Sequence, residues 1–166
     1  MFLLAGFALA FSVYQNYTAL AEQNSRIKTH FTAWEAAMAP RVTMLRDLAE
    51  ITEPYDHRAT QAQDEADRIL AEAPGGSGPQ ARIAMYTILE NALASLHGLA
   101  IRYPQLRESD LFREWETGYL RNQIAADGAR TGYNSAVRAY NNILDSFSGK
   151  LIALLFTVPP KPLIPE

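Results

Sequence analysis

The chain has 166 residues, the size of a single domain, and its 48% apolar and 20% charged residues exclude wholesale disorder. The formal net charge is −3 and Lys and Arg form no block, which argues against a nucleic-acid partner. The chain contains no cysteine, which excludes disulfides and thiolate metal sites.

The first 21 residues carry no charged side chain and predict a helical membrane anchor, because an uncharged helix of about 20 residues can cross a bilayer. Two other interpretations stay open: a secretory signal cleaved after Ala19-Leu20-Ala21, and a buried core helix. No Lys or Arg precedes the apolar run, which argues against the signal. The predicted anchor residues are Phe2, Leu3, Leu4, Phe7, Leu9, Phe11, Val13, Tyr14 and Tyr17.

Apolar residues at alternating spacings of three and four continue past the anchor and predict a helix over residues 22–52 that is continuous with it. Phe31 and Trp34 lie in this stripe. Pro40 is expected to kink the helix near Ala36, and Pro54 to end it by about Thr52.

Two further helices are predicted over residues 55–73 and 79–103. The first has an alanine-rich stripe, and a loop from Pro74 to Pro79 separates it from the second, whose stripe includes Leu89 and Leu96. The short connection over residues 104–109 predicts that the next helix packs antiparallel to this one.

The longest regular stripe predicts a helix over residues 110–147 that packs against partner helices. The stripe residues predicted to lie in the helix seam include Phe112, Trp115, Tyr119, Asn122, Tyr133, Tyr140, Ile143 and Phe147. The predicted fold is therefore all-α. An N-terminal transmembrane helix (1–21) continues into a long antiparallel up–down bundle of three or four helices (22–147), and a short C-terminal helix and a proline-rich tail (148–166) follow.

A short apolar run follows Ser148-Gly149. Its members are Leu151, Ile152, Leu154, Leu155 and Phe156. The run is too short to span a bilayer, so it either contacts lipid headgroups or a membrane-embedded partner, or folds back to cap the bundle core.

Polar residues in the seams need hydrogen-bonding partners. Asn24 and Asn122 occupy stripe positions, where one asparagine can fix helix register or alternatively contact a ligand. Asn134, Asn141 and Asn142 flank the seam, where they can bond across helices or to a partner chain.

No motif of the chain predicts catalysis, cofactor binding or a metal site. The three histidines, His30, His57 and His97, form neither an H-E-x-x-H motif nor a Glu-x-x-His pair. We therefore expect a protein that is not an enzyme and has no cofactor.

The C-terminal half resembles the LemA family of bacterial membrane-anchored helical proteins. Tyr103-Pro104-Gln105-Leu106 resembles the family's YPxL turn, and residues 133–141, YNSAVRAYN, resemble its YNxAVxxYN helix. Residues 24–28, NSRIK, resemble its N-R-V-K run, whereas Phe31 stands where the family usually has Trp. The resemblance implies a membrane helix followed by a long antiparallel bundle, and it implies no established enzymatic activity.

Together these features predict a single-pass protein of the bacterial inner membrane or a specialised intracytoplasmic membrane. Arg26, Lys28 and Arg41 follow the anchor and place the bundle on the cytoplasmic side. The expected function is that of a scaffold or accessory subunit, with the lipid bilayer and other membrane-protein subunits as partners. The alternative is a membrane-anchored bundle that binds a small molecule or an ion, in the manner of a sensor.

Overall fold

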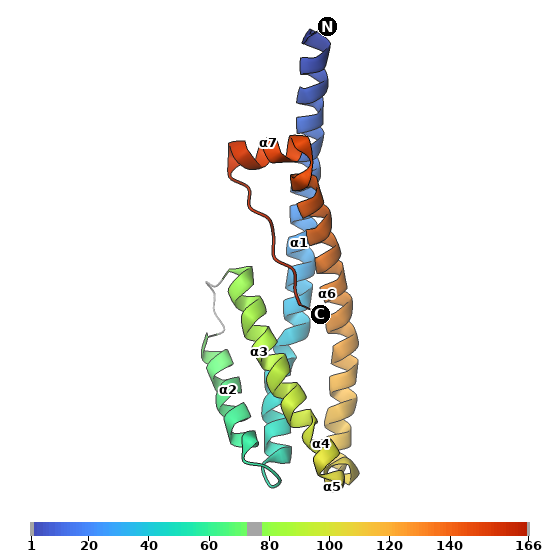
Figure 1. Ribbon diagram of the computed structural model, residues 1–166. Helices are drawn as coiled ribbons and strands as arrows, with labels where there is room; N and C mark the ends of the chain where they lie inside the picture. Colours follow the sequence, from blue (N-terminus) through green and yellow to red (C-terminus); the bar gives the residue numbers. More distant parts are fainter. Residues whose placement is uncertain (1, 73–77, 166) are drawn as a thin grey trace. The chain divides into compact units, whose positions relative to one another are not determined.

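The computed structural model describes residues 2–72 and 78–165, which form α-helices and no strand (Figure 1). The loop expected at residues 74–77 and Ala73 lie outside the described residues, as do the side chains of Phe2, Leu3, Leu4 and Leu9. The all-α helical bundle predicted from the sequence is confirmed.

The helices divide into two compact units, which are described separately. The first unit contains residues 1–33 and 128–166, and the second contains residues 34–127. The division into segments 1–21, 22–147 and 148–166 stays a prediction, because these units group residues by contact and not by role.

Helix α1 (Phe2–Thr52) contributes to both units, and so does α6 (Asp110–Asp145). α1 remains helical through Pro40 and ends two residues before Pro54, because proline disfavours a helical conformation in the residue that precedes it. α6 has 36 residues, about three times the length of an average globular helix, and packing along its apolar stripe stabilises such a length.

The predicted transmembrane anchor over residues 1–21 is not supported. No helix among residues 2–72 and 78–165 is both long enough and apolar enough to cross a membrane. The apolar run ends at Val13, and the polar residues Tyr14, Gln15, Asn16 and Tyr17 follow it inside the same helix.

The second unit is built from the C-terminal part of α1, the N-terminal part of α6 and four helices between them. These four are α2 (Arg58–Glu72), α3 (Pro79–His97), α4 (Leu99–Arg102) and α5 (Pro104–Glu108). The helix expected over 79–103 is thus interrupted at Gly98, a poor helix former, which separates α3 from α4.

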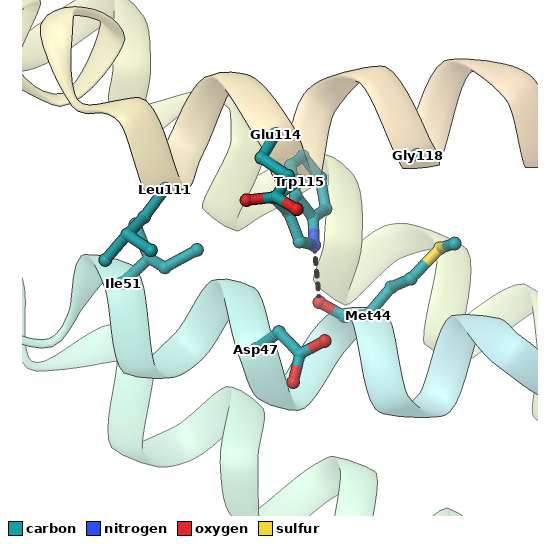
Figure 2. Close-up of a pocket in the computed structure, with 7 residues that line it drawn as sticks. All are labelled: Met44, Asp47, Ile51, Leu111, Glu114, Trp115 and Gly118. Carbon is teal, nitrogen blue, oxygen red and sulfur yellow. Dashed lines mark hydrogen bonds between the residues drawn. The ribbon is translucent and has the colours of Figure 1, made fainter.

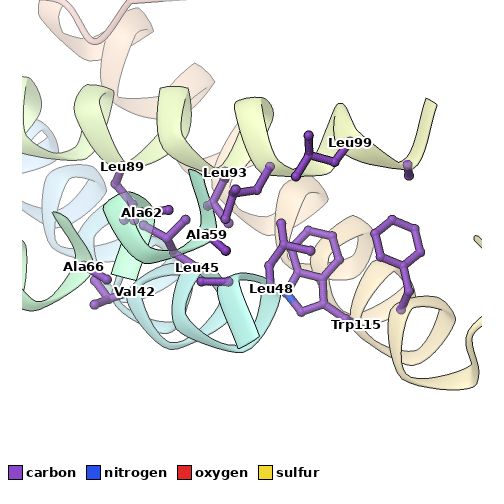
Figure 3. Packing of buried hydrophobic residues seen from close by; sticks show 14 of the residues in the cluster. Val42, Leu45, Leu48, Ala59, Ala62, Ala66, Leu89, Leu93, Leu99 and Trp115 are labelled. Carbon is purple, nitrogen blue, oxygen red and sulfur yellow. The ribbon is translucent and has the colours of Figure 1, made fainter. Parts of the chain in front are cut away.

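One hydrophobic core fills the second unit (Figure 3). Leu45 and Leu48 of α1, Leu93 of α3 and Phe112 of α6 are fully buried in it. α2 contributes mainly alanines, whose small side chains let it approach its neighbours closely. Truncating one of the buried leucines to alanine would cost about 2–5 kcal/mol of stability.

The first unit contains the N-terminal part of α1, the C-terminal part of α6, α7 (Phe147–Phe156) and the proline-rich segment 158–165. Phe31 of α1 packs against Tyr133 of α6, with ring centroids 5.5 Å apart. Figure 1 shows α7 crossing the end of α6 and the proline-rich segment running back beside α6. This unit holds most of the residues that the sequence singled out.

Candidate functional site

Hydrogen bonds fix the start of α7 against α1. The Asn16 Nδ2 donates to the hydroxyl oxygens of Ser146 at 3.0 Å and Ser148 at 2.6 Å. Ser12 and Ser148 share a further hydrogen bond of 3.1 Å. Ser146 also caps α7 by accepting from the Gly149 N–H, so α6 ends at Asp145 and the chain turns sharply there.

This turn corrects one expectation. Phe147, predicted as the last residue of the α6 stripe, is 73% exposed because it begins the new helix α7 instead of continuing α6. The remaining seam residues named from the sequence are buried or half-buried: Phe31, Trp34, Leu89, Leu96, Phe112, Trp115, Tyr119, Asn122, Tyr133, Tyr140 and Ile143.

α7 has two unlike faces. Ile152 is only 1% exposed and packs in the core of the first unit, and Leu151 is half-buried. Leu154 is 79% exposed, and Leu155 and Phe156 are also exposed. Leu154, Leu155 and Phe156 are therefore placed as expected for contact with lipid or a partner. Ile152 is placed as expected if the run folds back onto the core.

The exposed face of α7 has an apolar counterpart on α1. Tyr17 of α1 lies against Phe156 of α7, with ring centroids 6.2 Å apart. We call the following exposed residues of the first unit the apolar surface: Phe7, Phe11, Tyr14, Tyr17, Phe147, Leu154, Leu155 and Phe156. The residues of α1 recur at helical spacing and meet α7 at the Tyr17–Phe156 contact, and exposed apolar residues on neighbouring helices are typical of sites that bind lipid or protein.

A second feature is an asparagine clamp on α6. Asn134 and Asn141 each make two hydrogen bonds to one residue of the proline-rich segment. Asn141 donates to the Lys161 carbonyl at 3.0 Å and accepts from the Lys161 N–H at 2.9 Å. Asn134 does the same with Ile164, at 2.8 and 2.9 Å. Both asparagines were predicted to bond across helices or to a partner chain. In the structure they bind the main chain of the proline-rich segment instead.

Two neighbouring side chains support the clamp. The Tyr133 hydroxyl donates to the Pro162 carbonyl at 2.9 Å, and the Lys161 ammonium lies over the Tyr140 ring at 5.7 Å from its centroid. Burial raises the pKa of both Tyr133 and Tyr140, so both phenols stay protonated and Tyr133 keeps its donor proton at neutral pH. Ile164 inserts its side chain into the core of the unit.

Asn24, the other seam asparagine of the first unit, is half-buried. It lines a hollow of about 470 Å³, together with Tyr140 and residues of α1, α7 and the proline-rich segment. The hollow is open and mainly apolar in its lining residues, which include Ile152 and Phe156.

The second unit contains a buried polar cluster around Arg41, which is 1% exposed. Its Nε donates to Asn122 at 2.7 Å, its Nη2 donates to Gln123 at 2.6 Å, and its guanidinium pairs with Glu90. Asn122 also donates to the Ala37 carbonyl at 2.9 Å. These contacts give Asn122 the partners that a seam amide needs, and they hold α1, α3 and α6 in register.

The second unit also contains an open groove between α1 and α6 (Figure 2). It measures about 320 Å³, and Ile51, Leu111 and the acidic side chains of Asp47 and Glu114 line it. At its floor the Trp115 indole donates to the Met44 carbonyl at 2.8 Å. Among the described residues, no group of three or more His, Asp or Glu could hold a metal ion.

The Arg41 cluster was not predicted from the sequence. An arginine is usually exposed, and no pattern around Pro40 and Arg41 indicates that this one is buried. The asparagines of the clamp were identified from the sequence, but their partner was not. One sequence feature could have indicated this contact. Asn134 and Asn141 lie seven residues apart on one helix face, and the pairs Lys161-Pro162 and Ile164-Pro165 lie three residues apart in the tail.

A comparison with protein-family models matches residues 30–164 to the LemA family. No curated protein and no solved structure matches the chain.

Proposed function

This chain belongs to the LemA family, and we propose that it works at a membrane as a non-catalytic scaffold or accessory subunit that contacts the lipid–water interface through the apolar surface. The alternative of a ligand-binding sensor has less support, because the Arg41 polar cluster is occupied by contacts within the protein.

The observation that carries the proposal is the composition of the apolar surface. It combines aliphatic side chains with tyrosine and phenylalanine rings, and amphipathic rings such as Tyr14 and Tyr17 suit the boundary between headgroups and acyl chains. A helix that lies in this boundary buries only its apolar face and need not cross the bilayer. α7 has this character, with Ile152 directed into the protein and Leu154 and Leu155 directed outward.

Charge contributes little to the proposed contact. Lys150 is the single cationic residue of α7, so attraction to anionic lipids is weak and burial of apolar area dominates. We therefore expect binding to neutral vesicles that persists at high salt.

The test is cosedimentation of the full chain with neutral phosphatidylcholine vesicles. The variant Leu154→Glu/Leu155→Glu should bind at least about tenfold more weakly, because each buried leucine contributes about 1.5–3 kcal/mol. The matched control, Ile101→Glu/Ile124→Glu, changes two residues that are 78% and 76% exposed in the second unit, and should bind as the parent does. Equal binding by all three proteins would refute lipid contact through α7.

The accessory role requires protein partners as well as lipid. Extraction from native membranes in a mild detergent should yield the chain with other proteins in fixed stoichiometry, as judged by native mass spectrometry. Recovery as a free chain at every detergent concentration would contradict the accessory role.

The cytoplasmic placement of the bundle stays a prediction, which protease accessibility in sealed vesicles would test.

A further inference from the structure

The hydrogen bonds of the asparagine clamp all go to backbone atoms of the proline-rich segment. Four of its hydrogen bonds join the Asn134 and Asn141 amides to main-chain atoms, and Tyr133 adds a fifth to a main-chain carbonyl. Any chain in the same conformation with N–H groups at the two clamped positions would satisfy these contacts. These hydrogen bonds therefore select a bound segment by its backbone conformation and by the absence of proline at the two clamped positions.

The spacing of the clamp matches an extended chain. Seven residues of α-helix rise about 10.5 Å between Asn134 and Asn141. Three residues of polyproline II rise about 9.3 Å, and three of β-strand about 10 Å, between the clamped residues Lys161 and Ile164. The helix and the bound segment thus stay in register over both contacts.

The positions of proline fit this geometry. Lys161 precedes Pro162 and Ile164 precedes Pro165, and a residue before proline is biased away from the helical conformation toward the extended one. The clamped positions themselves keep their N–H groups, as the hydrogen bonds to the asparagine oxygens demand. The hydrogen bonds of the clamp therefore suit the pattern X-Pro-z-X-Pro, in which neither X is proline. The buried Ile164 adds a preference for an apolar residue at the second X.

The connection between α7 and the proline-rich segment is strained. Thr157 has a φ of 51° and a ψ of 48°, in the left-handed region, and it is the sole described residue other than glycine with positive φ. A β-branched residue in this region is an outlier that carries backbone strain. Thr157 is the C-cap of α7, where its own N–H and that of Val158 donate to the Ala153 carbonyl. Once the segment leaves the clamp, only these cap contacts oppose relaxation of Thr157.

We propose that the clamp also binds the proline-rich segment of a second copy of this chain, by exchange of residues 158–165 between two molecules. A strained connection favours such exchange, because the same contacts form in trans while the strain is lost. The exchanged state keeps all five hydrogen bonds and the buried Ile164, so it needs no new interface. This inference is independent of the lipid contact proposed above, since exchange requires protein concentration alone.

Two full-length variants test the exchange by complementation. The acceptor, Lys161→Pro/Ile164→Pro, loses the two N–H groups and leaves its own clamp empty. The donor, Asn134→Ala/Asn141→Ala, loses the clamp and leaves its own segment free. Neither variant can form the contact alone, but the donor segment can occupy the acceptor clamp when the two are mixed.

Light scattering and native mass spectrometry should show a heterodimer in the mixture, about tenfold more abundant than any dimer of either variant alone. Circular dichroism of each variant checks that both remain folded. The absence of a heterodimer between folded variants would overturn the proposal, with the segment then binding only within its own chain.

A second experiment, with a synthetic peptide, tests whether the clamp can bind a separate segment at all, independently of whether two chains exchange segments. A synthetic peptide of residues 158–166 should bind the acceptor, and N-methylation at the two clamped positions should weaken it about tenfold or more while keeping every side chain. Leu163→Ala in the peptide, at a partly exposed position between the clamped residues, should change binding less than about twofold. Equal binding of the N-methylated peptide would overturn the main-chain recognition on which the proposal rests.

Discussion

Glycines of the first unit have opposite effects on stability, depending on what surrounds them. A Cβ added to Gly149 would lie 1.8 Å from the Ile143 carbonyl oxygen, a fixed backbone atom at the turn into α7. A Cβ added to Gly128, inside α6, would meet nothing within 4 Å. One glycine is therefore required by close approach, whereas the other only lowers helix propensity.

We predict that Gly149→Ala destabilises the protein by about 2–4 kcal/mol, because the turn must open to admit the methyl group. Gly128→Ala should stabilise it by about 0.5–1 kcal/mol through helix propensity. Urea unfolding followed by circular dichroism measures both changes in the same protein. If both substitutions raised stability, the tight contact between α7 and the end of α6 would be wrong.

Two adjacent asparagines provide a similar contrast. Asn141 holds Lys161 through two hydrogen bonds, whereas its neighbour Asn142 is exposed. We predict that Asn141→Ala speeds amide hydrogen exchange at Lys161 by tenfold or more, since a contact of about 1.4 kcal/mol or more is lost. Asn142→Ala should leave that amide unchanged. Mass spectrometry or NMR on the full chain distinguishes the two outcomes.

At the scale of the helices, the buried Arg41 joins three elements of the second unit. It lies on α1, pairs with Glu90 of α3 and donates to Asn122 of α6. Its guanidinium also lies over the Tyr119 ring, 5.2 Å from the centroid. A buried cation with several fixed partners specifies one register among helices whose apolar stripes alone would tolerate others.

We predict that Arg41→Leu costs about 3–5 kcal/mol, because Glu90 and the two amides lose their common partner. The matched control is Arg46→Leu on the same helix, where Arg46 makes an exposed ion pair with Asp67 and its loss should cost less than about 1 kcal/mol. Thermal unfolding of the two variants gives the comparison. Equal costs would mean that the Arg41 cluster adds nothing beyond a surface ion pair.

Much of the element order could be predicted from the sequence, because helix periodicity and proline are local signals. The end of α1 before Pro54 and the stripe from Phe112 to Tyr140 are examples. The end of α6 was placed two residues late because Phe147 continued the stripe, and only the Ser146 cap reveals the turn. The predicted anchor is not supported, because absence of charge does not by itself make a helix apolar enough to cross a bilayer.

The candidate site was less predictable, because it depends on contacts between distant segments. Asn134 and Ile164 are thirty residues apart, and no local pattern indicates that the Asn134 side chain forms hydrogen bonds with the backbone of Ile164. Likewise, the alternation within α7 that buries Ile152 and exposes Leu154 depends on where α7 meets α1 and α6.

At the scale of the whole molecule, buried or half-buried phenols occur in both units and make its stability sensitive to alkali. Burial raises the pKa of Tyr86 and Tyr119 in the second unit and of Tyr133 and Tyr140 in the first. In each case the folded pKa lies above the unfolded value of about 10. Their contribution to stability is therefore fully present below about pH 10 and is lost as the pH rises through the folded values.

We predict that these four phenols ionise late and together with alkaline unfolding, because forming a buried phenolate requires the fold to open. A titration of phenolate absorbance beside helical circular dichroism should show a late absorbance step that coincides with loss of helix. Tyr140→Phe removes one phenol whose pKa is raised by burial alone, so it should shrink the late step and move the unfolding midpoint to higher pH. Complete phenolate formation while the helices remain intact would contradict the burial of these rings.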